Sequence, residues 1–142
     1  MNQEFISEAT TTINASTSRV WEALTNPGLL KQFLYGTEVT SDWKVGSPIT
    51  YRGEWQGKAY EDKGEIVRIE PPALLVHTHW SPLSGLPDEP DNYQEVTWAL
   101  EERNGRTELT IAERNLPSEQ AKATSEDGWR TALDALKSLL EK

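Results

Sequence analysis

The chain has 142 residues, no cysteine and a formal net charge of −9. The absence of cysteine excludes disulfides, thiolate nucleophiles, iron–sulfur ligation and cysteine-based zinc sites. The negative charge argues against a nucleic-acid partner, because binding to phosphates requires clustered Lys and Arg, and here these residues are scattered.

The length fits a single domain spanning residues 1–142. The N-terminus lacks the basic start and apolar core of a signal peptide, and no apolar run approaches the roughly 18 residues that a membrane span needs. We therefore expect a cytoplasmic protein with no membrane insertion.

The first third of the chain predicts one strand followed by two short helices. Residues 5–15 alternate and are rich in Thr and Ile, which favours a strand. Ser16 can cap a helix that follows it, and Pro27 suits the first position of a second helix. The second helix would present an apolar face made of Leu29, Leu30, Phe33 and Leu34.

The middle of the chain has the period of two that is typical of strands. Strands are predicted at residues 49–55, 64–70, 73–80, 94–102 and 107–113. Asn104-Gly105 indicates a hairpin turn, because both residues tolerate positive φ. The segment between these strands at residues 81–92 is long and rich in proline, so it is either a lid carrying Leu83 and Leu86 or a tolerated insertion.

The end of the chain predicts one long helix from about Ser118. An apolar stripe at spacings of three and four marks its buried face, through Trp129, Ala132, Leu133, Leu136, Leu139 and Leu140. Gly128 interrupts this helix, and a glycine there often allows close packing. The whole pattern predicts an α+β fold in which a curved antiparallel sheet of about six or seven strands and the final helix enclose an apolar pocket.

Several motifs, in their order and spacing, are similar to those of one protein family. They are Ala15–Leu24 followed by Asn26-Pro27, then Val45-Gly46, Gly64–Pro71, Thr107–Thr110 and Gly128-Trp129. The chain resembles the helix-grip fold of START-related and birch-pollen-allergen-type proteins, in the branch of homologues of the activator of heat-shock-protein-90 ATPase. This resemblance implies a sheet wrapped around the C-terminal helix and a cavity that often binds apolar or amphipathic molecules. Because branches of the fold include lipid carriers, polyketide cyclases, hormone receptors and co-chaperones, function must be argued from the site.

Aromatic residues on the faces expected to point inward are the main candidates for a ligand site. Flat apolar walls with indole N–H or phenol O–H groups would hold and orient a small molecule. The alternative is that these rings complete a solid core. The candidate ligand-binding residues are Leu30, Phe33, Tyr51, Trp55, Thr78, Trp80, Trp98, Trp129 and Leu133.

His77 and His79 lie two residues apart on a predicted strand, so they share a side. They could form a metal site or an acid–base pair. Because Thr78 and Trp80 belong to the face expected to point inward, we expect both histidines to point outward, and no third metal ligand is evident. The opposite register would bring both imidazoles into the cavity.

A polar group formed by Arg52, Glu54, Glu65 and Arg68 is interpreted as ion pairs on a solvated face, with a buried catalytic pair as the alternative.

The sequence leads to three hypotheses for the function. The first is a binding or carrier domain for a small apolar or amphipathic molecule. The second is a polyketide-cyclase-like or hydrolase-like enzyme acting in the cavity. The third is a co-chaperone or stress-response interaction protein. We expect no metal or cofactor, and a monomer or weak homodimer.

Overall fold

The computed structural model of the chain describes residues 5–34, 36–82 and 85–141, without the side chain of Trp55. Its helices are α1 (Thr17–Thr25), α2 (Pro27–Phe33) and α3 (Glu119–Leu140), with a 3-10 turn η2 (Pro90–Asn92). Its strands are β1 (Phe5–Ile13), β2 (Glu38–Ser41), β3 (Pro48–Trp55), β4 (Lys58–Glu70), β5 (Leu74–His79), β6 (Gln94–Arg103) and β7 (Arg106–Leu116).

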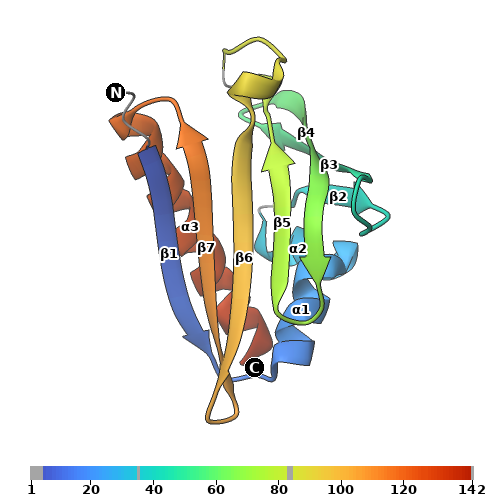
Figure 1. Cartoon of the computed structure of the whole chain (residues 1–142), viewed down its shortest axis with the longest axis vertical. Helices are drawn as coiled ribbons and strands as arrows, with labels where there is room; N and C mark the ends of the chain where they lie inside the picture. Colours follow the sequence, from blue (N-terminus) through green and yellow to red (C-terminus); the bar gives the residue numbers. More distant parts are fainter. Residues whose placement is uncertain (1–4, 35, 83–84, 142) are drawn as a thin grey trace.

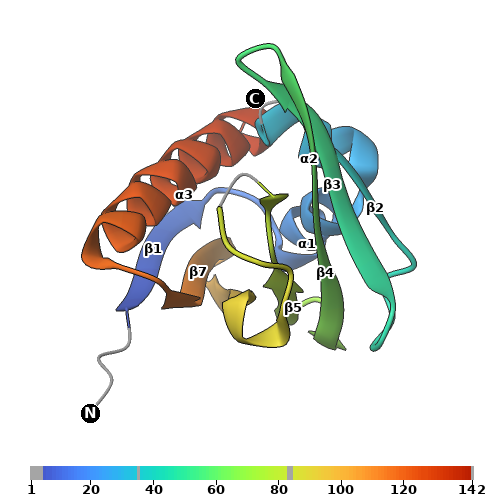
Figure 2. The same ribbon diagram turned by 90° about the horizontal axis from the view of Figure 1, so that it is seen from above.

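All strands join one antiparallel sheet in the order β1-β7-β6-β5-β4-β3-β2. Figure 1 shows α1, α2 and α3 together behind this sheet, with α3 behind β1 and β7. Seen from above, α3 lies on one side and the β3–β4 hairpin on the other, with β7 and β5 between them (Figure 2). The predicted helix-grip architecture is therefore confirmed. None of the helices in the described residues is long and apolar enough to cross a membrane.

The helices begin where the sequence places their capping residues. Ser16 Oγ accepts a hydrogen bond from the backbone N–H of Arg19 at 3.2 Å, at the start of α1. The Asn26 side chain accepts from Gly28 N–H at 2.9 Å, and Pro27 takes the first position of α2. These caps satisfy backbone N–H groups that have no partner inside the helix, which fixes the break between α1 and α2.

Two of the hairpins in the sheet have tight two-residue turns, and one of these turns was not predicted. Asn104 and Gly105 adopt positive φ of 54° and 81° between β6 and β7, as expected for this turn. Gln56 and Gly57 do the same between β3 and β4, with φ of 51° and 80°. Because this turn was not predicted, the expected strand at 64–70 is too short. β4 begins at Lys58 and carries further side chains over the inner face.

The register of β5 contradicts the predicted orientation of its side chains. Leu75 lies opposite Trp98, and His77 lies opposite Val96. Directly opposed residues of an antiparallel pair point to the same face, so both histidines of β5 point inward with Trp98. Thr78 lies on the outer face, and the expectation that it faces the cavity is wrong.

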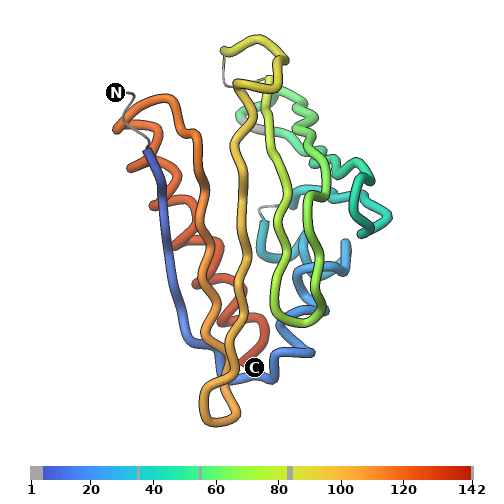
Figure 3. The backbone as a smooth tube through the Cα atoms, viewed as in Figure 1, coloured from blue at the N-terminus to red at the C-terminus, as the bar shows by residue number. Residues whose placement is uncertain are grey.

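The core lies between the inner face of the sheet and the three helices. Leu30, Phe33 and Leu133 are 2–3 % exposed and belong to this core. A register shift between Ile66 and Arg68 lets β4 place both Ile66 and Ile69 against the core. Such a bulge bends the strand, and here it contributes to the curvature of the sheet. Figure 3 shows the β5–β6 loop and the β6–β7 turn at opposite ends of the sheet.

Candidate functional site

A pocket of about 260 Å³ lies between α3 and the inner face of the sheet. Sites for drug-sized ligands usually have about 300–1,000 Å³, so this pocket suits a molecule of one or two rings. Its lining residues are Leu34, Thr37, Tyr51, Tyr60, Asp62, His77, His79, Val96, Trp98, Glu113, Ser125, Gly128, Trp129 and Ala132.

One face of α3 and five strands build this pocket. Ser125, Gly128, Trp129 and Ala132 are spaced so that they share one side of the helix. Opposite them, the inward positions of β3 to β7 supply aromatic, imidazole and carboxylate side chains. The pocket therefore exists because α3 does not fill the whole concave side of the curved sheet.

The structure divides the candidate ligand residues into four groups. Tyr51, Trp98 and Trp129 line the pocket. Leu30, Phe33 and Leu133 lie in the solid core, as described above, and the side chain of Trp55 lies outside the described residues. Thr78 lies on the outer face of β5, and Trp80 lies on the same side just after the strand. There Trp80 stacks on Tyr93, with ring centroids 6.3 Å apart.

His77 is held in one neutral form by two hydrogen bonds. The Trp98 indole N–H donates to its Nε2 at 3.1 Å, so that nitrogen carries the lone pair. Its Nδ1 lies 3.0 Å from the Thr78 carbonyl oxygen and must therefore carry the proton. Burial, with a smaller effect of His79, lowers the pKa of His77 to about 4. Both ring nitrogens are thus occupied, and this imidazole positions Trp98 rather than transferring protons.

Tyr51 lies against both histidines. Its hydroxyl is 3.4 Å from His77 Nδ1 and 3.3 Å from Nε2, and its ring meets the His79 ring edge-on at 5.6 Å. Burial raises the pKa of Tyr51, and the negative charges of Asp62 and Glu113 raise it further. The phenol therefore stays protonated and offers the pocket a neutral hydroxyl.

His79 forms a pair with Asp62 at the β4 side of the pocket. Its Nε2 lies 3.0 Å from Asp62 Oδ2. Asp62 Oδ1 is shielded from solvent and has no hydrogen-bond partner. A carboxylate that orients an imidazole is the arrangement used in general base catalysis. In this pair, however, the buried Oδ1 of Asp62 is left without a hydrogen-bond donor.

Glu113 forms the opposite wall and is only 9 % exposed. Its Oε1 accepts the Ser125 hydroxyl at 2.6 Å and the Trp129 indole N–H at 3.0 Å. The hydroxyls of Ser7 and Ser125 are 2.7 Å apart, which extends this network to β1. Both of these hydrogen bonds are accepted by Oε1, and neither uses Oε2.

The comparisons with known proteins agree with this architecture. The family model described as "Activator of Hsp90 ATPase homolog 1-like protein" matches residues 14–141. The chain belongs to this family. The resemblance seen in the motifs is thereby confirmed, while no curated protein matches.

Solved structures of other proteins have the same fold as this family member. A solution structure from Cytophaga hutchinsonii is 45% identical, with 99% of this chain and 97% of that chain covered and a TM-score of 0.86. The solution structure of the Aha1 dimer from Colwellia psychrerythraea is 20% identical, with 96% of each chain covered and a TM-score of 0.75. CalU16 from Micromonospora echinospora is 23% identical, with 97% of this chain and 85% of that chain covered and a TM-score of 0.73.

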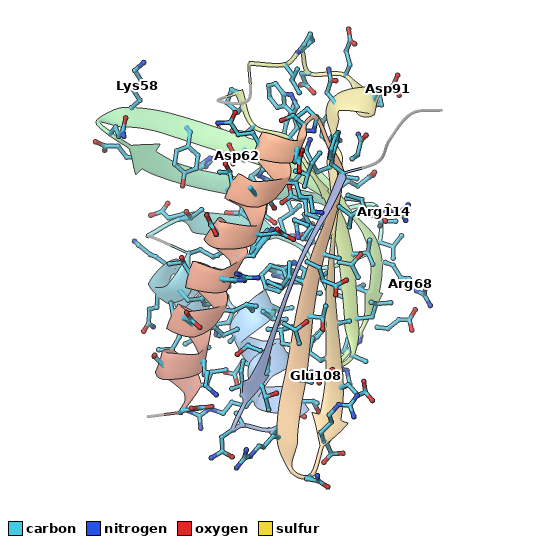
Figure 4. The ribbon with its side chains drawn as sticks, turned by 90° about the vertical axis from the view of Figure 1, so that its left-hand side faces the viewer. Lys58, Asp62, Arg68, Asp91, Glu108 and Arg114 are labelled. Carbon is cyan, nitrogen blue, oxygen red and sulfur yellow. The ribbon has the colours of Figure 1, made fainter. Side chains whose placement is uncertain are left out.

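The charges around the pocket of this family member are unevenly placed. Two carboxylates line it, whereas no Lys or Arg is among its lining residues in the described part of the chain. Figure 4 shows Asp62 on the same side of the sheet as α3, and Arg68 and Arg114 on the far side. Within residues 5–34, 36–82 and 85–141, no group of three or more His, Asp or Glu side chains is arranged to hold a metal.

The outer face carries several ion pairs and the described part of the long loop. Arg52 pairs with Glu61 at 3.4 Å across the β3–β4 hairpin, and Arg68 pairs with Glu70. Both arginines thus form ion pairs on a solvated face, but with other partners than the expected Glu54 and Glu65. Asp88 in the loop accepts from Lys63 Nζ and from the Tyr93 hydroxyl, each at 2.5 Å. Leu83 lies outside the described residues, and none of the described loop residues lines the inner pocket. The described part of the loop is therefore anchored on the outer face.

Gly128 faces the pocket without allowing any close contact, in contrast to its predicted role in packing. A Cβ placed on it would meet no atom within 4 Å apart from its chain neighbours and the backbone of its own helix. Gly128→Ala is expected to stabilise the protein by up to about 1 kcal/mol, because alanine favours a helix interior over glycine. Urea unfolding of wild type and variant measures this gain. A loss of stability would mean that α3 needs a glycine here for packing.

Proposed function

We propose that this chain binds a small amphipathic molecule in the pocket under α3, as a binding or carrier domain. The observation that supports this most strongly is a partly open space of about 260 Å³ bordered by four aromatic rings, those of Tyr51, Tyr60, Trp98 and Trp129. Apolar walls with a few fixed polar groups are typical of small-molecule sites.

The polar groups at this site are held in place before a ligand arrives. Trp98 is fixed by His77, and Trp129 is fixed by Glu113. The two indole rings also meet edge-on, with centroids 5.3 Å apart. Groups held in position by the protein lose little entropy when they bind a ligand, which favours a binding role for this wall.

Isothermal titration calorimetry with three two-ring probes tests the proposal. The probes are 2-(1-naphthyl)ethylamine, 2-(1-naphthyl)ethanol and 1-naphthylacetic acid, and the variant Gly128→Phe serves to fill the pocket. Wild type is expected to bind at least one probe, and Gly128→Phe is expected to bind none while unfolding at a similar or higher temperature. Failure of all three probes with wild type, or equal binding by the filled variant, would contradict the proposal.

Family membership supports a second candidate, a role as a co-chaperone that stimulates the Hsp90 ATPase. The matching family model is named for this activity. Addition of the purified chain to Hsp90 would then raise the rate of ATP hydrolysis several-fold, and Gly128→Phe would have no effect on this rate because it changes only the inner pocket. An unchanged hydrolysis rate at saturating chain would reject this candidate.

A further inference from the structure

We infer that the pocket selects ligands whose polar end is a positively charged amine, and that Glu113 and Asp62 provide this selectivity. The inference rests on the proposed binding function and adds the chemical class of the ligand. It follows from the lining itself, which combines two carboxylates and four aromatic rings with no Lys or Arg among its described residues.

Glu113 provides the more defined of the two contacts. Its side chain is held at Oε1 by Ser125 and Trp129, so its position is fixed before a ligand enters. Its Oε2 takes part in neither of these hydrogen bonds. An ammonium group is a donor that matches such an oxygen, and hydrogen bonds between charged partners are about twice as strong as neutral ones.

Asp62 adds negative charge from the opposite wall. His79 reaches only its Oδ2, and its Oδ1 is buried without any hydrogen-bond donor. A buried carboxylate oxygen without a donor is unfavourable, and a cation nearby would compensate it electrostatically even without direct contact. A carboxylate or phosphate ligand would instead be repelled by both walls.

The aromatic rings fit the same class of ligand. The faces of Trp and Tyr rings attract cations through their quadrupole, and amine-binding sites in proteins often combine such rings. Tyr51, Tyr60, Trp98 and Trp129 all border the pocket. The ring body of an arylalkylamine would therefore meet apolar walls, while its ammonium end would meet both the rings and the carboxylates.

The three naphthyl probes show which polar end the pocket prefers, because they share one ring system and differ mainly in the charge of the polar group. At pH 8 and low salt, wild type is expected to bind 2-(1-naphthyl)ethylamine on the order of tenfold more tightly than the alcohol, and the carboxylic acid most weakly. Glu113→Gln is expected to remove most of this preference and to change the affinity for the alcohol less than about threefold. The glutamine Oε1 can still accept from Ser125 and Trp129, so the fold is expected to be kept.

Glu61→Gln is the matched control. Glu61 lies next to Asp62 in the sequence but on the exposed side of β4, so this variant removes one negative charge from outside the pocket. It should keep the preference for the amine, whereas Asp62→Asn should reduce it.

Equal affinities of wild type for amine and alcohol would overturn the inference while leaving the binding function in place. An equal loss of amine affinity in Glu61→Gln and Glu113→Gln would also overturn it, because net charge alone would then explain the effect. Failure of all three probes would overturn the binding function and this inference together.

Discussion

Gly64→Ala is expected to lower the free energy of unfolding by about 3 kcal/mol or more, because the added methyl group has no room. A Cβ on Gly64 would lie 1.8 Å from the carbonyl oxygen of Thr78 and 2.5 Å from its carbonyl carbon. These are backbone atoms of the neighbouring strand and cannot rotate away, so β4 and β5 would have to separate. Urea unfolding followed by tryptophan fluorescence measures the loss.

Gly128→Ala provides the matched control for this prediction. It makes the same chemical change in the same protein, but its Cβ meets no atom within 4 Å apart from its chain neighbours and the backbone of its own helix. The two variants should therefore shift stability in opposite directions. A Gly64→Ala protein within 1 kcal/mol of wild type would show that β4 and β5 are not this close at Gly64.

The stability of the protein is expected to fall in acid partly because His77 is buried in its neutral form. Its pKa is about 4 in the folded chain, compared with an ordinary value of 6.5. Between these values the unfolded chain binds a proton that the folded chain does not, so stability decreases as pH falls. This one group should remove about 2–3 kcal/mol of stability between pH 7.5 and pH 4.5.

The variant His77→Gln isolates this contribution. Asp62, Glu113 and His79 remain in both proteins, so their own titrations largely cancel when the two unfolding free energies are subtracted. Any advantage of wild type over His77→Gln should be constant above pH 7.5 and should shrink by about 2–3 kcal/mol by pH 4.5. If the difference does not change with pH, then His77 is not buried as a neutral group.

Much of the fold could be predicted because local signals and tertiary structure agree. Ser16, Asn26 and Ser118 can cap helices in any context, and all three do so here. The spacing of Leu133 and Leu136 predicts one buried face of the last helix, and both residues are at most 2 % exposed. These features depend on neighbours in sequence, so periodicity reveals them.

The orientation of β5 could not be predicted in the same way. Leu74, Leu75 and Val76 are consecutive apolar residues, so the strand has no clear alternation to define its inner face. Val76 is 9 % exposed and points outward, while Leu75 is 2 % exposed and points inward. The pairing of Leu75 with Trp98 decides the register, and this contact between distant residues is not visible in the local pattern.

The acidic groups of the pocket were missed for a related reason. Glu113 follows Leu109 and Ile111 at intervals of two residues, so its side chain points to the same inner face of β7. In the sequence, however, a carboxylate after these apolar residues indicates the end of a strand. Its network with Ser125 joins residues from β7 and α3 that only the fold brings together. Asp62 was overlooked because the turn before β4 was not recognised. A polar residue that extends an apolar face is the signal that would have found Glu113.

The NMR signals of the tryptophan indole N–H groups test the central claim most directly. Trp98 and Trp129 donate inside the pocket to His77 and Glu113, whereas the Trp80 indole donates to the Leu86 carbonyl on the outer face. On titration with 2-(1-naphthyl)ethylamine, the signals of Trp98 and Trp129 are expected to shift to saturation while that of Trp80 stays in place. Shifts confined to Trp80, or none at saturating amine, would contradict a ligand site beneath α3.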